Sequence, residues 1–288
     1  MIEVYKAGFM TTIQDIGRPG YAHLGIPASG FMDQTSAREA NSMLGNEVRA
    51  PLLEVDVAGI GLRFNVDCTV AVAGARARVN INQQPQNTSD CIDVYRGDQL
   101  EIASLTAGMW TYLAFAGGLV AEKFLGSCAT LLVAQLGGFQ GRRLQKNDAL
   151  SLKQPSLVKG KPKLPLTRRP HNTLHSLAVT RGPEFDLFSP NARQSLTRQA
   201  FTMTEHISRQ GMKMTGPKLK LNKQVDINSS GLVPGSLQVT PGGEYIITHR
   251  DSQTTGGYPR MAVLCQDNLD FLAQVRPGED IYFYVRSA

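Results

Sequence analysis

Short apolar runs, repeatedly interrupted by turn residues, constrain the fold of this chain more than any other feature. Examples between Leu52 and Gly118 are residues 61–66 and 69–73. Side chains on a strand point alternately to its two faces, so a period of two is typical of a strand that buries one face. Short strands spaced by roughly 8–12 residues predict an antiparallel sandwich or barrel. We therefore expect a mainly β protein with two β-rich, barrel-like domains and a few short helices.

The second half of the chain carries the same pattern after a proline-rich interruption. Residues 153–172 contain Pro155, Pro162, Pro165 and Pro170, and proline-rich stretches often mark linkers. The interruption predicts an N-terminal domain of residues 1–160 and a C-terminal domain of residues 161–288. Further strands are predicted in the second half at residues 177–180, 201–203, 212–214, 237–239, 245–247, 261–264 and 281–285.

Three segments have helical character. The first, residues 34–44, follows Asp33, whose side chain can accept hydrogen bonds from the free N–H groups of a first helical turn. It ends before Gly45, a residue type that readily adopts the left-handed conformation found after helices. Shorter helices are predicted within residues 187–200 and 267–274.

The net charge of +6 comes from one segment of the chain. Residues 149–183 contain seven Lys and Arg residues and no Asp or Glu, and the rest of the chain sums to about −1. A basic run among prolines, without interleaved aromatic residues, indicates a solvated linker rather than a phosphate-binding face. We therefore expect no nucleic-acid partner.

The cysteines and the apolar runs indicate a cytoplasmic protein. The four cysteines, Cys68, Cys91, Cys128 and Cys265, are widely spaced and have small or apolar neighbours, which predicts buried, reduced thiols. No apolar run approaches the roughly 20 residues of a membrane span, and no signal peptide is visible. We expect no membrane association.

Several common catalytic and binding motifs are absent from the sequence. It contains no phosphate loop, no G-x-G-x-x-G and no G-x-S-x-G. His171 and His175 have the spacing of two metal ligands on a helix, but they lack an adjacent glutamate and lie beside the prolines, so we expect no metal. Cys128 has no neighbour in sequence that would lower its pKa and is predicted to be a buried turn residue.

Two glycine-bent polar loops remain as candidate sites. The N-terminal loop, residues 11–33, offers Gln14, Asp15, Arg18, Ser29 and Asp33. The C-terminal loop, residues 253–260, offers Gln253, Thr254, Thr255 and Tyr258. Such donors and acceptors suit an amide or urea-like group, which needs paired hydrogen bonds and stabilisation of developing negative charge. The alternative interpretation of the second loop is a hairpin with polar decoration.

The order of motifs resembles a known family. Residues 8–21 and 25–33, with Ala40-Asn41 and Gly45-Asn46, are similar to the N-terminal signature of the biotin-dependent carboxyltransferase family, also called allophanate hydrolase subunit 2. That family includes the C-type component of bacterial ATP-dependent 5-oxoprolinase, the KipA antagonist protein and part of the carboxyltransferase domain of urea carboxylase. Later matching pieces are Leu53-Glu54 and residues 116–118, 126–127, 137–142, 182–184, 231–235, 253–260, 272–274 and 277–278.

This resemblance implies two β-rich domains, the C-terminal one a cyclophilin-like barrel. It implies a heteromeric complex with a KipI-like protein, which is the B-type partner, and with an A-type partner. It further implies a small amide substrate and no covalently bound cofactor. In a 5-oxoprolinase the complex uses ATP, whereas urea carboxylase uses carboxybiotin on a separate carrier.

One motif departs from the family pattern. Relatives often read Ser-Asp/Asn-Arg-Met-Gly-Tyr-Arg-Leu where this chain has residues 207–214. Arg209 and Gly211 are kept, but Met212 replaces the tyrosine and Lys213 replaces the arginine. If the tyrosine contacts a ligand, substrate choice or activity changes; if it packs, methionine is a suitable filler.

The resemblance implies the C-type component of an ATP-dependent 5-oxoprolinase, which converts 5-oxoproline to glutamate and is inactive without its partners. The alternatives are a biotin-dependent carboxyltransferase acting on urea or a similar amide, and a KipA-like regulator of a KipI-like partner. The predicted catalytic residues are Asp15, Arg18 and Asp33. The predicted substrate-binding residues are Gln14, Ser29, Arg209, Gln253, Thr254, Thr255 and Tyr258.

Overall fold

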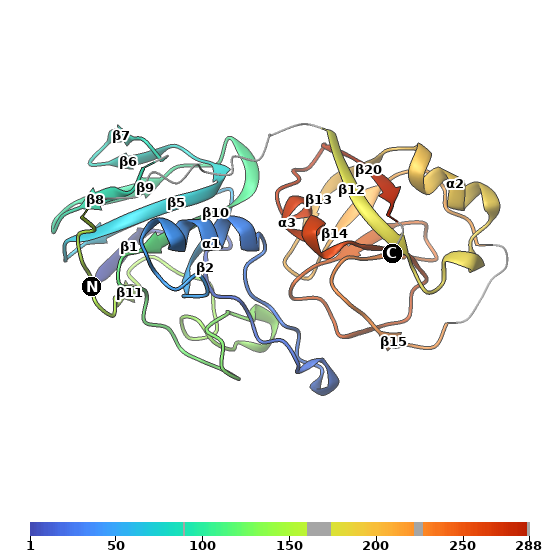
Figure 1. The fold of residues 1–288 in the computed structure, drawn as a ribbon, viewed down its shortest axis with the longest axis horizontal. Coiled ribbons are helices and arrows are strands. Elements are labelled where there is room, and N and C mark those ends of the chain that lie inside the picture. The colour runs from blue at the N-terminus through green and yellow to red at the C-terminus, as the bar shows by residue number, and fades with distance from the viewer. Residues whose placement is uncertain (89, 160–173, 222–226, 287–288) are drawn as a thin grey trace. The chain divides into compact units, whose positions relative to one another are not determined.

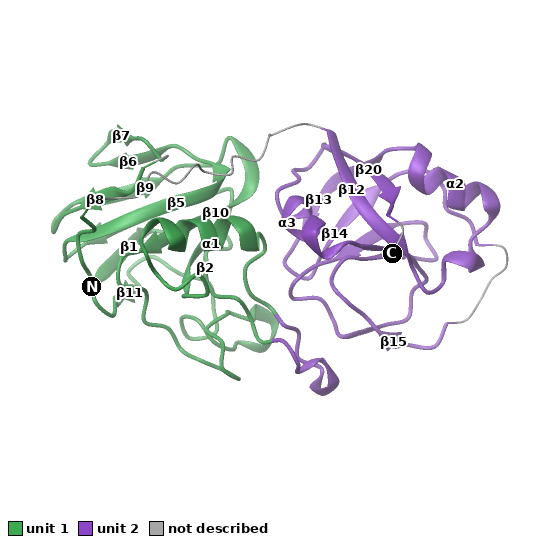
Figure 2. Cartoon of the chain, in the orientation of Figure 1, with its two compact units in different colours: residues 1–18, 29–170 green, residues 19–28, 171–288 purple. Residues whose placement is uncertain are grey.

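The computed structural model describes residues 1–88, 90–159, 174–221 and 227–286 (Figure 1). It divides into two compact units (Figure 2). Unit 1 comprises Met1–Arg18 and Ser29–Pro170, and unit 2 comprises Pro19–Ala28 and His171–Ala288. Strands dominate both units, which confirms the mainly β fold. The predicted domain boundary at residues 160 and 161 lies outside the described residues.

Unit 1 contains two antiparallel sheets. The first has the strand order β11-β1-β4-β9-β6-β7 and the second β2-β3-β10-β5-β8. The strands of the first sheet are β1 (Ile2–Lys6), β4 (Ile60–Phe64), β6 (Val79–Ile81), β7 (Gln84–Gln86), β9 (Gln99–Ile102) and β11 (Ala149–Leu150). Those of the second are β2 (Thr12–Gln14), β3 (Leu52–Val55), β5 (Cys68–Arg76), β8 (Ile92–Val94) and β10 (Ala107–Phe115). The sequence missed the short β7 and β11 and assigned β2 to a loop.

Helix α1 (Gln34–Met43) packs against β5 and β10 of unit 1. Its N-terminus is capped by Asp33, whose carboxylate accepts a hydrogen bond from the Ser36 N–H at 3.1 Å. After the helix the chain changes direction at Gly45, whose φ of 70° lies in the left-handed region that residues with a Cβ rarely adopt. This helix and its first residue are as predicted, and it ends at Met43, one residue before the predicted end at residue 44. The apolar face buries Ala37, Ala40 and Met43.

Unit 2 is built on a closed seven-stranded barrel with the order β12-β19-β16-β17-β14-β13-β20. Its strands are β12 (Leu174–Arg181), β13 (Phe201–Ile207), β14 (Gly211–Thr215), β16 (Ser236–Val239), β17 (Tyr245–Thr248), β19 (Arg260–Leu264) and β20 (Asp280–Val285). Neighbouring strands are antiparallel except β12 and β20, which pair in parallel and close the barrel. The barrel confirms the fold predicted for this half.

The remaining elements are short. Helix α2 (Pro190–Arg198) begins at Ser189, whose hydroxyl accepts from the Ala192 N–H at 3.2 Å, and α3 (Leu269–Leu272) follows a 3-10 turn. Both confirm predicted helices. The 3-10 turns are η1 (Ala22–Leu24), η2 (Leu132–Ala134), η3 (Phe185–Leu187) and η4 (Gln266–Asn268).

A two-stranded sheet of β15 (Ser230–Gly231) and β18 (Thr255–Gly256) completes unit 2. The sequence indicated only a loop at β18. All four cysteines are buried and free, as predicted. Within the described part of the chain, no helix has both the length and the apolar character needed to cross a membrane.

Candidate functional site

The N-terminal loop is joined to residues 127–130 of unit 1, and we call residues 12–18 with residues 127–130 the N-terminal clasp. The buried carboxylate of Asp15 is the centre of the clasp. It accepts hydrogen bonds from the Gly17 N–H at 2.8 Å, the Ser127 hydroxyl at 2.5 Å and the Cys128 N–H at 2.5 Å. Three donors satisfy most of what one carboxylate can accept.

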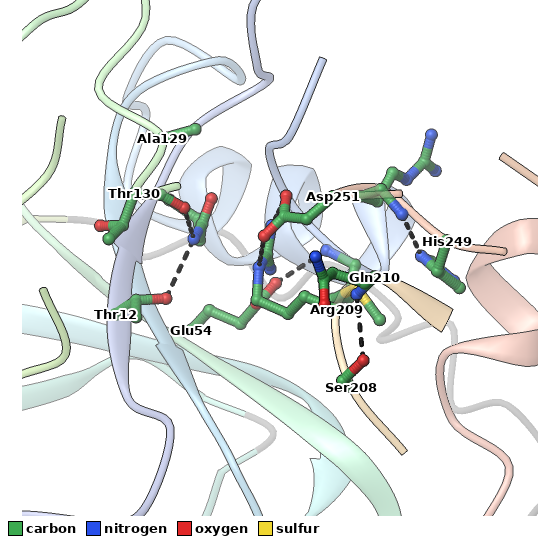
Figure 3. A network of polar contacts seen from close by, with 12 residues as sticks. Thr12, Glu54, Ala129, Thr130, Ser208, Arg209, Gln210, His249 and Asp251 are labelled. Atoms are coloured by element: carbon green, nitrogen blue, oxygen red, sulfur yellow. Dashed lines mark hydrogen bonds and ion pairs between the residues drawn. The ribbon is translucent and has the colours of Figure 1, made fainter. Parts of the chain in front are cut away.

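The other polar side chains of the clasp also form hydrogen bonds within the protein. The amide nitrogen of Gln14 donates to the Thr12 hydroxyl and to the Thr130 carbonyl, both at 3.0 Å, as Figure 3 shows for these labelled partners. The Thr130 hydroxyl donates to the Ile13 carbonyl at 2.8 Å. Arg18 is buried, and its guanidinium donates to the backbone carbonyls of Phe124 and Ala129.

Ser29 and Asp33 lie beyond the clasp in the same unit. Ser29 is buried at φ 57°, and Asp33 caps α1. The turn between them is held by Glu54, a fully buried residue that accepts from the Met32 N–H at 2.7 Å and from the Tyr112 hydroxyl at 3.0 Å. The sequence placed Glu54 in a family motif but gave no sign of this role. Burial and the nearby Glu54 and Asp33 carboxylates raise the pKa of Tyr112 well above its usual value, so the phenol remains a donor.

Unit 2 contains a cavity of about 570 Å³ on the outer face of its barrel. Its floor follows from strand register. Lys213 pairs with Ile246, and Ile246 pairs with Gln238, so these three side chains form one row across β14, β17 and β16. The next row along this face pairs Gly211 with Thr248. The intervening residues of each strand point into the barrel core, as the period of two requires.

The walls and roof of this cavity come from loops. The β13–β14 hairpin contributes one wall, and the C-terminal loop with Leu232 contributes the roof. The lining residues outside the floor are Glu205, His206, Ile207, Ser208, Gln210, Leu232, Ser252, Gln253, Gly256, Gly257 and Tyr258. We call the floor, walls and roof together the barrel pocket. Its volume lies in the range typical of small-molecule sites.

A buried ion pair joins the hairpin wall of the barrel pocket to the segment that leads into its roof. Arg209 and Asp251 are both buried, and the guanidinium donates to the carboxylate from Nε at 2.7 Å and from Nη2 at 3.1 Å. The labelled pair is visible in Figure 3. Asp251 also donates its backbone N–H to the Arg209 carbonyl at 2.9 Å. The pair therefore holds the Ser208–Gln210 turn to the segment that leads to Ser252 and Gln253.

A second ion pair fixes the roof. Glu184 accepts from Nε of Arg260 at 2.8 Å and from Nη2 at 2.6 Å. Arg260 further donates to the Ser230 hydroxyl at 2.9 Å and to the Gly231 carbonyl. These contacts attach β15 to the end of the C-terminal loop, and hydrogen bonding to Arg260 lowers the pKa of Glu184.

The structure brings only some of the predicted C-terminal residues to the cavity. Gln253 and Tyr258 line it, whereas Thr254, Thr255 and Arg209 do not. The Thr254 carbonyl accepts from the Leu232 N–H at 2.8 Å, which ties the C-terminal loop to the roof. Roles for these residues in catalysis or substrate binding remain predictions.

Gln238 is a pocket residue that sequence reasoning missed. It is 5% exposed and lines the cavity, yet its side-chain amide makes no hydrogen bond to any described residue. The amide faces the cavity, where water or a ligand can complete its hydrogen bonds. The available signal was the polar residue between Leu237 and Val239 in a strand whose other residues are buried.

Met212 and Lys213, the two residues that depart from the family pattern, lie on opposite faces of β14. Met212 is fully buried inside the barrel, so it packs there as the filler interpretation requires. Lys213 points to the opposite face and lines the barrel pocket. Among the described residues, no group of three or more His, Cys, Asp or Glu side chains could hold a metal ion.

Comparison with solved structures defines the class of fold. The chain superposes on the crystal structure of Kluyveromyces lactis urea carboxylase with a TM-score of 0.93 and 30% identity, covering 99% of this chain and 27% of that one. The K. lactis urea amidolyase structure gives a TM-score of 0.92 at 30% identity, with 99% of this chain and 19% of that chain covered. The chain therefore spans about a fifth to a quarter of these larger enzymes.

Comparison of sequences defines the family. Residues 24–285 match the family model described as the carboxyltransferase domain, subdomain A and B. The 5-oxoprolinase C subunits of Escherichia coli and Haemophilus influenzae are 32% identical over 287 residues and 34% identical over 286, each covering 98% of this chain and 90% of the relative. The urea amidolyase of Lachancea kluyveri is 32% identical over 305 residues, covering 98% of this chain and 17% of that protein. The chain belongs to the carboxyltransferase domain, subdomain A and B, family, which confirms the resemblance.

Proposed function

We propose that this chain is the C-type component of a heteromeric, ATP-dependent 5-oxoprolinase that acts with A-type and B-type partners in the cytoplasm. In the overall reaction the amide C–N bond of 5-oxoproline breaks, a water oxygen adds to the carbonyl carbon, and glutamate forms as ATP is hydrolysed. The C subunits of E. coli and H. influenzae support the assignment, because 90% of their length has a counterpart in this chain.

The observation that carries the proposal is the barrel pocket and its polar groups. Gln238 presents its side-chain amide to the cavity, and Gln253 and Tyr258 add further donors and acceptors at the roof. A lactam offers one N–H donor and one carbonyl acceptor, which an amide side chain can match with two hydrogen bonds. The pocket is therefore suited to a small amide.

The N-terminal residues have a supporting function in this proposal. Asp15, Arg18 and Asp33 are each engaged by backbone or side-chain partners, so we assign them to orienting the loops of unit 1. Gln14 and Ser29 are buried beside them, and the Gln14 carbonyl oxygen and the Ser29 hydroxyl have no partner among the described residues. Both atoms are buried, so a ligand reaches them only if this region rearranges.

The test is reconstitution. The chain is co-expressed with its A-type and B-type partners, and 5-oxoproline-dependent ATP hydrolysis is measured with each component omitted in turn. We expect turnover only from the complete complex. Asp15→Ala and Arg18→Ala should lower turnover at least tenfold, because each disconnects the clasp. Lys6→Ala, which removes an exposed ion pair of unit 1, is the matched control. Wild-type turnover in both clasp variants contradicts the assignment of the N-terminal residues.

The second candidate is biotin-dependent carboxyl transfer to urea or a similar amide. The superposition on urea carboxylase favours it. In this case the complex should transfer labelled carboxylate from carboxybiotin on a separate carrier protein to urea, without 5-oxoproline. Tight partner binding with turnover of neither substrate instead indicates a KipA-like regulator of a KipI-like partner.

A further inference from the structure

We propose that the row Lys213–Ile246–Gln238 on the barrel face recognises a small ring that carries an amide at one end and a carboxylate at the other. This inference deepens the proposed function, since 5-oxoproline is such a ring. It is a statement about ligand binding by unit 2 and needs no partner protein.

The dimensions of the row match such a ligand. The three residues lie on three adjacent strands in direct register. Neighbouring strands are ~4.8 Å apart, so the backbones of Lys213 and Gln238 are separated by about 10 Å. A five-membered ring lies between them over Ile246, an apolar platform, while Lys213 and Gln238 reach its two ends.

Gln238 supplies the side-chain amide that forms hydrogen bonds with the amide of the ligand. Its side-chain amide faces the cavity and makes no hydrogen bond to a described residue, and the Gly256 end of the roof lies close to it. A Cβ added at Gly256 would be 2.8 Å from its Nε2 and 3.3 Å from Leu232. An alanine at this position would therefore displace the end of the Gln238 side chain from its present place.

Lys213 supplies the ammonium that pairs with the carboxylate of the ligand. Its ammonium lies 3.2 Å from Glu244, and both side chains are substantially exposed, at 39% and 57%. An exposed pair contributes little free energy, so a ligand carboxylate can displace it. The other charged or titratable groups of the pocket are Glu205 and His206 on the hairpin wall and the Tyr258 phenol of the roof.

The row distinguishes the two candidate substrates of the family. Urea has no carboxylate for Lys213 and no hydrocarbon body for Ile246, so it uses only Gln238. A lactam with a carboxylate uses all three positions. We therefore expect the pocket to prefer the acidic ring over urea by at least tenfold.

The test uses calorimetric titration of the full chain with three matched rings. These are 5-oxoproline, 2-pyrrolidinone, which lacks the carboxylate, and cyclopentanecarboxylate, which lacks the amide. Wild type should bind 5-oxoproline about tenfold more tightly than either of the others. Equal affinity for all three, or no binding of any ring, overturns the proposal.

Two substitutions should separate the ends of the ligand. Gln238→Met should weaken 5-oxoproline and 2-pyrrolidinone about tenfold and leave cyclopentanecarboxylate unchanged. Lys213→Gln should weaken 5-oxoproline and cyclopentanecarboxylate and leave 2-pyrrolidinone unchanged, and Lys213→Arg should restore carboxylate binding. A uniform loss for all rings indicates misfolding of the pocket and contradicts the assignment of either residue to one end.

A pair of glycine variants tests access to Gln238. Gly256→Ala should weaken the two amide rings, whereas the nearest atom to a Cβ at Gly257 is the Ile227 carbonyl oxygen at 3.7 Å, so Gly257→Ala should not. Failure of this inference is distinguishable from failure of the proposed function. Turnover of 5-oxoproline by a complex whose KM is unaffected by Gln238→Met and Lys213→Gln refutes only the inference. The expected binding pattern without turnover in any complex refutes only the function.

Discussion

The N-terminal clasp and the barrel pocket use similar residues for opposite purposes. In the clasp, the Asp15 carboxylate and the Arg18 guanidinium are directed at backbone groups of the same unit. In the pocket, Gln238 and Gln253 are directed at a cavity. Polar side chains on glycine-bent loops therefore do not define a binding site by their type. The distinction is whether the protein itself supplies their partners.

The difference has an energetic basis. A buried charge is tolerated only when hydrogen bonds replace those lost from water, and the clasp provides them within the chain. The pocket keeps its charged groups at the exposed margin, and the polar residues that it buries are neutral, which carries a smaller penalty. We therefore expect substitutions in the clasp, and in the buried pair that supports the pocket, to affect stability. Substitutions of pocket-lining residues should affect binding.

The largest effect on stability is expected from Asp251→Ala. It removes the carboxylate of a buried ion pair and leaves the Arg209 charge without it, which typically costs about 3–5 kcal/mol. Hydrogen exchange of the barrel amides in increasing urea measures the loss in unit 2. Glu244→Ala removes only the exposed pair with Lys213 and should change stability by less than about 1 kcal/mol. Similar losses for the two variants contradict a structural role for the buried pair.

Asp15→Ala should destabilise unit 1 by about 3 kcal/mol, because the Ser127 hydroxyl and two backbone N–H groups lose their acceptor. The single tryptophan of the chain, Trp110, is buried in unit 1 and reports its unfolding by fluorescence. The Trp110 transition should move to lower urea while protection of the barrel amides is unchanged. An unchanged Trp110 transition shows that the three hydrogen bonds make no net contribution to the stability of unit 1.

Acidification should destabilise unit 2 through His249. This imidazole is fully buried, and burial and the neighbouring Arg250 charge hold its pKa well below 6.5. Its Nδ1 accepts from the Arg250 N–H at 2.9 Å, so its Nε2 donates to the Leu269 carbonyl at 3.1 Å. Below pH 6.5 the unfolded chain binds a proton that the folded unit does not. The free energy of unfolding of unit 2 is therefore at its full value above pH 6.5 and falls by up to ~1.4 kcal/mol per pH unit below pH 6.5.

The control for this pH dependence is a matched pair of histidine variants. Barrel amide protection is compared at pH 7 and pH 5 in His249→Gln and in His206→Gln, whose side chain lies at the exposed end of β13. The slope due to His249 should disappear in the first variant and persist in the second. A slope retained in His249→Gln assigns the effect to another group.

A smaller and local effect is expected from Glu184→Gln, which weakens the mostly buried pair with Arg260 by about 1 kcal/mol. The change should be local, with faster hydrogen exchange at Thr255 and Leu232 and little change at the barrel core. The wild-type contribution is present above pH 4.5 and is lost as pH falls through the lowered pKa of Glu184. Faster exchange throughout unit 2 instead indicates that this pair supports the whole barrel.

The sequence predicted most of the strands and all three helices, because alternation and capping are local properties. Asp33 and Gly45 bound α1 through contacts within a few residues, and such contacts can be inferred from spacing. Strand β18 was missed because its two residues are defined by a partner, β15, that lies 25 residues earlier in the chain. Pairing over that separation leaves no periodic signal in a segment so short.

The candidate site was predicted less completely than the fold. Gln253 and Tyr258 were identified from residue type and motif order, and both line the pocket. Gln238 was missed because a glutamine in a strand is ordinarily an exposed residue, and only the register with Ile246 and Lys213 places it under the roof. Arg209 was predicted to contact substrate, but the sequence could not show that Asp251, 42 positions later, would pair with it.

The parallel pairing of β12 with β20 sets the order of events in biosynthesis. Residues 174–179 must wait for residues 280–285 before the barrel can close, since the two strands are direct neighbours. Loop closure over about a hundred residues is slow compared with forming a hairpin. During translation, unit 2 therefore remains an open sheet with two unpaired edges until its final strand emerges. Those edges are sites for chaperone binding or aggregation in the nascent chain.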